Sequence, residues 1–334
     1  MALLEVSDLH VEFTTFGGIV HAVRGASFHV DRGETLAIVG ESGCGKSVAV
    51  QSLLGLIPMP PGRITKGSAT FNGHDILTSR FIDKKDIRGN MVGMIFQDPM
   101  TSLNPTMTIG DQIAEPLQLH RSMSKGQAHA RAIELLEMTR IPEAAKRAKQ
   151  YPFEFSGGML QRAMIAMALA CGPSLLIADE PTTALDVTIQ AQILDLVADL
   201  QKEHSMALIL ITHDLGVVAR MADRVAVMYA GEILESGTVD DIFYRSSHPY
   251  TIGLIGAMPT NRKEVNQELL PIPGSPPDLF SPPVGCGYSP RCPHAMEACL
   301  DNRPTSFEMS NTHYAKCWLH HADCDTKIEE VHTV

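Results

Sequence analysis

The sequence has little aromatic content and no long apolar run. Aromatic residues make up 5% of the 334 residues, and tryptophan occurs once. No stretch approaches the roughly 18–20 apolar residues that a membrane-spanning helix needs, and the longest candidate, Met164 to Ala178, is interrupted by Gly172-Pro173. The first residues contain neither a basic stretch nor a long apolar stretch, so no secretory signal is predicted. We therefore expect a cytosolic chain.

Basic residues are in the minority. The chain has 27 Lys and Arg against 38 Asp and Glu, which gives a formal net charge of -11. A net negative surface argues against a non-specific nucleic-acid binder, because nucleic acid is itself an anion. The seven cysteines are expected to be reduced in the cytosol unless a metal holds them. The length leaves room for two or three domains.

The most specific pattern in the sequence is a phosphate-binding loop. It reads G-x-x-x-x-G-K-[ST] in the segment Gly40-Glu41-Ser42-Gly43-Cys44-Gly45-Lys46-Ser47. Glycines let successive backbone N–H groups turn toward phosphate oxygens, and the following helix directs its positive N-terminal end at the same anion. We predict that Lys46 reaches the β- and γ-phosphates and that Ser47 places its hydroxyl on Mg²⁺. An apolar strand over residues 35–39 and an apolar helix over residues 47–54 provide the expected context.

Three further polar positions follow apolar runs that are typical of buried strands. The run over residues 174–178 ends in Asp179 and Glu180, and we predict that Asp179 holds Mg²⁺ through water while Glu180 polarises the attacking water. Gln97 can coordinate Mg²⁺ or orient a water, and His213 can contact a γ-phosphate. Taken singly, Gln97 is more often a surface residue and His213 an ordinary histidine at a strand end.

Two other segments are weaker candidates for nucleotide contacts. Residues 1–30 alternate between apolar and polar types around Gly17-Gly18, which predicts antiparallel strands joined by a turn. Phe13 or Phe16 in this stretch could stack on an adenine ring, and packing toward the core is an equally good interpretation. In Ser156-Gly157-Gly158 the serine is a good helix N-cap and the glycines expose backbone N–H groups, so this loop can hold an anion.

The order of these motifs resembles the ATP-binding subunit of ABC transporters over about residues 3–258. The resemblance implies an α/β fold, a P-loop NTPase (RecA-like) core with an antiparallel β subdomain and a helical subdomain over about residues 98–170. It also implies a head-to-tail dimer, in which ATP lies between the phosphate loop of one subunit and the Ser156-Gly157-Gly158 signature of the other. The signature departs from the commonest Leu-Ser-Gly-Gly-Gln at Phe155 and Met159, and Met159 cannot hydrogen-bond as glutamine would.

Each role is assigned by position in the family pattern. The resemblance implies that Glu180 is the catalytic base, that His213 senses the γ-phosphate and that Asp186 organises the dimer seam. Cys44, where serine is commoner, is expected to contribute only its backbone N–H. The implied nucleotide and Mg²⁺ contacts are Gly40, Glu41, Ser42, Gly43, Cys44, Gly45, Lys46, Ser47, Gln97 and Asp179, with Phe13 or Phe16 at the adenine and Ser156, Gly157 and Gly158 at the partner's ATP.

The composition changes after Met258, and we predict a separate C-terminal domain over residues 259–334. This segment is rich in proline and contains five cysteines, of which Cys324 is the last. Their spacing matches no zinc ribbon, and the low apolar content suggests that a metal or cluster replaces a core. A cluster, a zinc ion and free or disulfide-bonded thiols remain open, and His313, His320 and His321 are expected to be solvated. The four candidate ligands are Cys286, Cys292, Cys299 and Cys317.

Three stretches are similar to the oligopeptide/dipeptide/nickel import ATPases. They are residues 96–105, 178–188 and 285–293. In that group the four cysteines are implied to hold a [4Fe–4S] cluster, to which thiolate ligands are suited, and zinc is the alternative. The similarity implies an ATPase that powers peptide import through a membrane permease. The runner-up functions are import of nickel or another small solute and, less favoured, a non-transport ABC ATPase.

The same similarity implies the partners. They are a second ABC ATPase subunit that is a different chain, two transmembrane permease subunits and an extracytoplasmic solute-binding protein, with no nucleic acid. The chain is accordingly expected at the cytoplasmic face of the inner membrane as a peripheral subunit. Ribosomal or DNA-repair ABC proteins usually carry two nucleotide domains or a long coiled coil, and neither is visible in this sequence.

Overall fold

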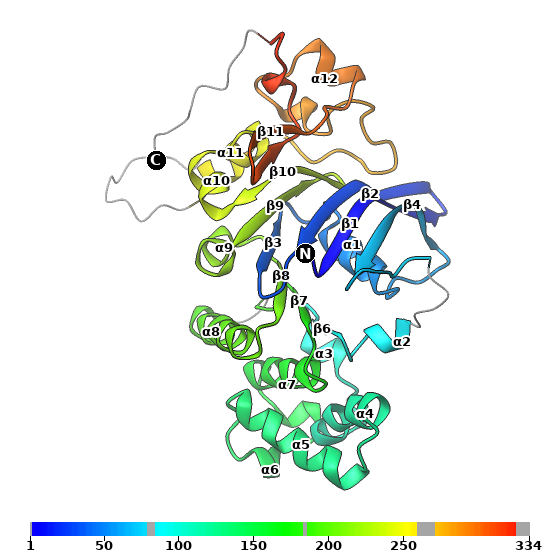
Figure 1. Cartoon of the computed structure of the whole chain (residues 1–334), viewed down its shortest axis with the longest axis vertical. Coiled ribbons are helices and arrows are strands. Elements are labelled where there is room, and N and C mark those ends of the chain that lie inside the picture. The colour runs from blue at the N-terminus through cyan, green and yellow to red at the C-terminus, as the bar shows by residue number, and fades with distance from the viewer. Residues whose placement is uncertain (1, 79–83, 183–185, 259–270, 325–334) are drawn as a thin grey trace, which may run out of the picture. The chain divides into compact units, whose positions relative to one another are not determined.

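The computed structural model describes residues 2–78, 84–182, 186–258 and 271–324 (Figure 1). The chain forms two compact units, and each is assembled from separate stretches of sequence. The first unit contains Met1–Leu3, Val30–Thr35 and Asn72–Ile211, and the second contains Leu4–His29, Leu36–Phe71 and Thr212–Val334. None of the helices in the described ranges is both long and apolar enough to cross a membrane.

The second unit begins with antiparallel strands, as the alternating pattern predicts. Strand β1 (Leu4–Thr15) lies between β2 (Gly18–Val30) and β4 (Gly62–Phe71), and β1 pairs with β4 in antiparallel register. The apolar positions of β1 are buried and the polar positions between them are mostly exposed, because successive side chains of a strand point to opposite faces. The turn at Gly17-Gly18 separates β1 from β2 as expected.

A second sheet of this unit includes the strand before the phosphate loop. Within this unit its strands follow the order β11 (Phe307–Ser310), β12 (His313–Ala315), β10 (Glu232–Thr238), β9 (Arg224–Tyr229) and β3 (Thr35–Val39). Strands β3 and β9 are parallel, and the pairs β9–β10, β10–β12 and β11–β12 are antiparallel. The remaining helical elements are α1 (Lys46–Leu53), α9 (Leu215–Met221), α10 (Val239–Tyr244), α11 (Pro249–Gly256), η2 (Ser289–Arg291), α12 (Glu297–Asp301) and η3 (Trp318–His320).

The C-terminal segment packs on the core of this second unit. Its strands β11 and β12 extend the sheet through β10, and Cys286, Tyr288 and Cys299 belong to the same apolar cluster as Tyr229 and Tyr250. The predicted domain boundary between residues 258 and 259 stays a prediction, because residues 259–270 lie outside the described part of the chain.

The first unit contains three parallel strands and most of the helices. Strand β7 (Leu175–Asp179) pairs with β6 (Val92–Ile95) on one side and β8 (Ala207–Ile211) on the other. All three strands are buried along their whole length, which is why their sequences are continuous apolar runs. The helix α8 (Val187–His204) lies between β7 and β8 in the sequence, and the unit also contains β5 (His74–Asp75) and α2 (Lys84–Ile87).

A helical part of the first unit lies between β6 and β7 in the sequence. Its elements are α3 (Pro99–Ser102), α4 (Ile109–Arg121), α5 (Lys125–Met138), α6 (Ala144–Arg147), η1 (Pro152–Glu154) and α7 (Gly157–Leu169). Side-chain caps define where its helices begin: Thr108 caps α4, and Ser124 forms a capping box with Gln127 at the start of α5. Apolar side chains of α4, α5 and α7 form one core cluster.

Candidate nucleotide-binding site

The backbone of the phosphate loop approaches neighbouring backbone so closely that two positions require glycine. Gly40 has a φ of 150°, and a Cβ atom there would lie 2.0 Å from the carbonyl oxygen of Met228. Gly45 has a φ of 103°, and its Cβ would lie 2.3 Å from the carbonyl oxygen of Ala22. Residues with a side chain rarely adopt such φ values, so the backbone path of this loop depends on the glycines of the motif.

Lys46 lies back over its own loop. Its side chain is buried, and its Nζ donates hydrogen bonds to the carbonyl oxygens of Gly40 (2.8 Å) and Glu41 (3.0 Å). The ammonium is thereby held where loop backbone converges, which is the place where the motif binds phosphate. Burial raises the pKa of the nearby Cys44 thiol, so Cys44 is not an activated thiolate.

Two residues that the sequence reasoning missed, Tyr250 and Arg291, form hydrogen bonds with Glu41 of the loop. The backbone N–H of Glu41 donates to the hydroxyl of Tyr250 at 3.0 Å. The Glu41 carboxylate accepts two hydrogen bonds from Arg291, at 2.7 and 3.0 Å. Arg291 directly precedes one predicted cysteine ligand, Cys292. This position was the one feature of the sequence that could have marked Arg291 as a functional residue. The exposed loop residues are Ser42 and Gly43.

In the first unit the structure brings Gln97 and Glu180 together. The Nε2 of Gln97 donates to a carboxylate oxygen of Glu180 at 3.0 Å. Asp179 is the last residue of β7 and is buried, and Glu180 follows with its backbone N–H donating to the carbonyl oxygen of Ile211 at 2.9 Å. Glu180 has a φ of 47°, a left-handed conformation that is uncommon for a side chain of this size and is found at functional sites.

The signature segment forms the N-terminus of α7. The hydroxyl of Ser156 accepts from the backbone N–H of Met159 at 3.4 Å, so Ser156 is the predicted N-cap. Ser156 and Gly157 are exposed, and a Cβ on Gly158 would lie 2.9 Å from a methyl carbon of Ile189. Met159 packs against the helical core, which is compatible with the apolar residue at a position where the family pattern has glutamine.

The other predicted nucleotide and dimer residues lie at exposed or half-buried positions. His213 is exposed directly before Asp214, the N-cap of α9. Phe16 is fully exposed in the turn after β1, and Phe13 is half-buried in that strand. Asp186 caps α8 by accepting from the backbone N–H of residue 189, while residues 183–185 of the same motif lie outside the described residues. The roles assigned to these residues stay predictions.

The four predicted cysteine ligands line one cavity of the second unit. These four cysteines are free thiols, whereas Cys324 contacts the sulfur of Met296 and is not among the lining residues. Burial raises the pKa of Cys286 to about 11 and that of Cys317 to about 12, with neighbouring cysteines adding to both shifts. The lining residues are Cys286, Cys292, Cys299, Cys317, His248, Pro249, Tyr288, Ser289, His294, Trp318 and Leu319.

His248 brings an unpaired nitrogen to the lining of this cavity. Its Nδ1 accepts from the backbone N–H of Tyr250 at 3.0 Å, so the neutral ring carries its proton on Nε2. That Nε2 is buried and has no hydrogen-bond partner. Burial, together with a smaller effect of the nearby His320, lowers the pKa of His248 to about 3, so the ring is neutral at physiological pH.

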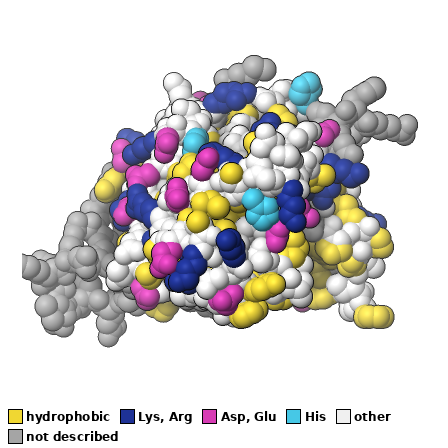
Figure 2. Space-filling model, turned by 90° about the horizontal axis from the view of Figure 1, so that it is seen from below, with side chains coloured by type: hydrophobic (Ala, Val, Ile, Leu, Met, Phe, Trp, Pro, Cys, Tyr) yellow, Lys and Arg dark blue, Asp and Glu magenta, His cyan; other side chains and the backbone are white. Residues whose placement is uncertain are grey.

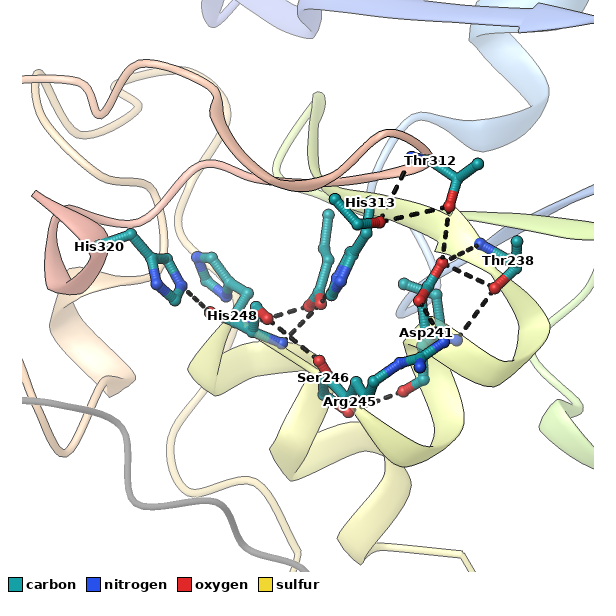
Figure 3. A network of polar contacts seen from close by, with 12 residues as sticks. Thr238, Asp241, Arg245, Ser246, His248, Thr312, His313 and His320 are labelled. Atoms are coloured by element: carbon teal, nitrogen blue, oxygen red, sulfur yellow. Dashed lines mark hydrogen bonds and ion pairs between the residues drawn. The ribbon is translucent and has the colours of Figure 1, made fainter.

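The expectation that His313 and His320 are solvated is wrong for His313. Its ring is buried, and its Nε2 lies 2.7 Å from a carboxylate oxygen of the fully buried Glu235 (Figure 3). Glu235 also accepts from the backbone N–H groups of Ser247 and His248. His320 Nε2 lies 2.6 Å from the carbonyl oxygen of Ser247. The pattern of polar and apolar residues could not predict these contacts, because the partners are far apart in the chain. These contacts attach β12 and η3 to the segment before α11.

Sequence comparisons identify the family. The model of the ABC transporter family matches residues 23–183, and that of the oligopeptide/dipeptide transporter C-terminal region matches residues 234–299. The oligopeptide transport ATP-binding protein OppD of Bacillus subtilis is 58% identical over 98% of this chain and 91% of its own length. The chain belongs to the ATP-binding proteins of the ABC transporter family, in their oligopeptide and dipeptide branch.

Two further relatives of this branch are similar over nearly their whole length. The dipeptide transport ATP-binding protein DppD of Bacillus subtilis is 55% identical over 95% of this chain and 94% of its own. The OppD of Salmonella typhimurium is 55% identical over 90% of this chain and 89% of its own.

Solved structures of ABC cassettes share the fold. The ATP-binding cassette MJ0796, in a dimeric post-hydrolysis state bound to ADP and Pi, has a TM-score of 0.63 at 27% identity, covering 71% of this chain and 98% of that one. CbiO1 from Clostridium perfringens has a TM-score of 0.60 at 27% identity, covering 72% of this chain and 90% of that one. The predicted α/β P-loop NTPase fold is confirmed.

The glycine requirement of the loop yields a direct test. We expect Gly40→Ala to weaken binding of a fluorescent ATP analogue at least about tenfold, because the added Cβ meets the Met228 carbonyl and the φ is unfavourable. Gly126→Ala on α5, where nothing lies within 4 Å, is the matched control and should bind normally. Wild-type affinity in the Gly40 variant would contradict the loop geometry.

Proposed function

We propose that this chain is an ATP-hydrolysing subunit that powers peptide import through a membrane permease by ATP-driven closure of a dimer. The observation that carries the proposal is its identity of 48–58%, over 90% or more of the chain, to ATP-binding proteins named for oligopeptide, dipeptide or peptide transport. The contribution of this subunit is ATP hydrolysis, so the cargo class comes from the relatives alone.

In this proposal some residues bind the nucleotide and others activate the attacking water. The loop N–H groups and Lys46 bind the phosphates, and Ser47, Gln97 and Asp179 would hold Mg²⁺, which would neutralise charge on the transferred phosphoryl group. Glu180 takes the proton of the attacking water. The hydrogen bond from Gln97 orients the Glu180 carboxylate and connects this base to the helical part, whose first helix begins two residues later.

Dimer closure supplies the second half of each nucleotide site. The exposed Ser156 and Gly157 at the start of α7 present a hydroxyl and backbone N–H groups to the ATP of the partner. Asp186, at the start of α8, faces the seam in this arrangement. The partner is a second ABC ATPase chain of different sequence, and the relative MJ0796 is described as dimeric.

The helical part is the proposed contact with the permease. Figure 2, seen from the side of α4–α6, shows charged side chains of both signs with apolar groups between them. The exposed large apolar side chains of the helical part include Met100, Leu119 and Phe153, and exposed apolar groups favour a protein interface. Two permease subunits and an extracytoplasmic solute-binding protein complete the importer, with this chain peripheral at the cytoplasmic face of the inner membrane.

The assignment of the base predicts a separation of binding from turnover. We expect Glu180→Gln to bind ATP but to hydrolyse it at least about 100-fold more slowly, because the amide cannot accept the proton of the water. Phosphate release and ATP-analogue titration measure the two steps. Glu203→Gln at an exposed site of α8 is the control. Normal turnover in the Glu180 variant would show that another group is the base.

We further infer that the cysteine cavity holds a [4Fe–4S] cluster through Cys286, Cys292, Cys299 and Cys317. The donor set fits, because four thiols line one cavity and thiolates are the usual cluster ligands. Among the described residues no group of three or more His, Cys, Asp or Glu side chains meets the geometry of a metal site, so the proposal rests on the chemistry of the four thiols that share this cavity.

His248 adds a second reason to place a group in this cavity. A buried N–H without an acceptor is costly, and the Nε2–H of His248 has none. A sulfide or thiolate of a bound cluster would accept this hydrogen bond, and hydrogen bonds to the sulfurs are among the features that set a cluster's reduction potential. The cluster supplies folding free energy to this segment when bound.

The cluster proposal is tested by composition and colour. Protein purified without oxygen should show broad visible absorption and contain about four irons per chain. Cys292→Ser should lose both, whereas Cys324→Ser, outside the cavity lining, should retain them. A colourless protein with one zinc per chain would establish a single-ion site and contradict the proposal.

A further inference from the structure

The segment that carries the cysteines contacts the phosphate loop through one side chain. Arg291 ends the turn η2 between Cys286 and Cys292, and its guanidinium makes the two hydrogen bonds to Glu41 at 2.7 and 3.0 Å. Glu41 is the second residue of the loop, directly after Gly40. The two paired residues are 250 positions apart in the sequence, and both belong to the second unit.

This ion pair is well placed to hold its geometry. The Arg291 side chain is 5% exposed and that of Glu41 is 25% exposed. The remaining guanidinium hydrogen bonds go to the hydroxyl of Tyr229 (3.2 Å) and to the carbonyl oxygens of Ile272 (3.3 Å) and Pro273 (2.8 Å). The hydrogen bond to Glu41 is the main reason that the pKa of Arg291 is raised. A fixed, two-point contact of this kind is stronger than an exposed ion pair.

The negative charge of Glu41 connects its ion pair with Arg291 to nucleotide binding. Glu41 is the one acidic residue of the segment 40–47, and the loop surrounds an anion of several charges. An unpaired carboxylate there would repel the phosphates. Arg291 neutralises the carboxylate and holds it in contact with the C-terminal segment.

We propose that Arg291 is a positioning residue for nucleotide binding, which holds the Glu41 carboxylate in an ion pair and so cancels the negative charge at the start of the phosphate loop. The inference rests on the proposed function, since it concerns binding of ATP. It makes the affinity for nucleotide depend on the folding of the segment that carries Cys286 and Cys292, so the C-terminal segment is part of the nucleotide site.

The test uses removal of charge on both sides of the pair. Arg291→Met retains the apolar stem and removes the guanidinium, and we expect it to bind a fluorescent ATP analogue with Mg²⁺ about tenfold more weakly. Glu41→Gln, which removes the carboxylate charge and leaves the other hydrogen bonds of Arg291 in place, is combined with it in a double variant. The double variant should recover most of the lost affinity, because no unpaired carboxylate remains.

Controls separate this role from a merely structural one. Arg303→Met, in the same segment and paired with Glu232, should not change nucleotide affinity. In Arg291→Met the loss of affinity relative to wild type should shrink as salt is raised, since added ions screen the repulsion between the unpaired Glu41 carboxylate and the phosphates. Visible absorption and circular dichroism report whether the segment remains folded.

The outcomes are decisive in each direction. Recovery in the double variant, with Arg303→Met unaffected, supports the proposal. Unchanged affinity in Arg291→Met, or a double variant that binds as weakly as Arg291→Met, overturns it while leaving the proposed ATPase function intact. Wild-type protein that binds no nucleotide overturns both.

Discussion

The close backbone approach at Gly40 and Gly45 is the constraint on which the rest of the nucleotide site depends. Between these two residues the chain passes within contact distance of the carbonyl groups of Met228 and Ala22, which belong to β9 and β2. The parallel pairing of β3 with β9 brings the loop to this place, and Lys46 is then held over the loop's own carbonyls. A change in either neighbouring strand would therefore change the shape of the anion site.

The C-terminal segment belongs physically to the unit that contains this loop. Strand β12 continues the sheet beyond β10, the buried pair Glu235–His313 attaches it, and Arg291 reaches Glu41. A segment with little apolar content can be ordered by such polar contacts and by a metal or cluster in place of a larger core. Its cysteine cavity and the phosphate loop thus lie in one compact unit, and the turn η2 contributes Ser289 to the cavity lining and Arg291 to the contact with the loop.

Local patterns predicted much of the fold and fewer of the contacts. The alternation of β1 and the continuous apolar runs of β6, β7 and β8 gave the correct strand types, because burial on one face or two leaves a direct trace in sequence. The sequence placed Gln97 and Glu180 after buried strands, and the hydrogen bond between them is a finding of the structure. No spacing rule could predict Arg291–Glu41 or Glu235–His313, since these pairs join residues 250 and 78 positions apart, and polarity alone made His313 look solvated.

Hydrogen–deuterium exchange with and without ATP and Mg²⁺ tests most directly that the loop and the cysteine segment act as one nucleotide-binding unit. The backbone amides of residues 40–47 should be protected by nucleotide, and those around Arg291 should gain protection at the same ATP concentration. Protection that stays confined to residues 40–47, with unchanged exchange in residues 286–292, would contradict the account. No protection in either segment would show that the chain does not bind ATP through this loop.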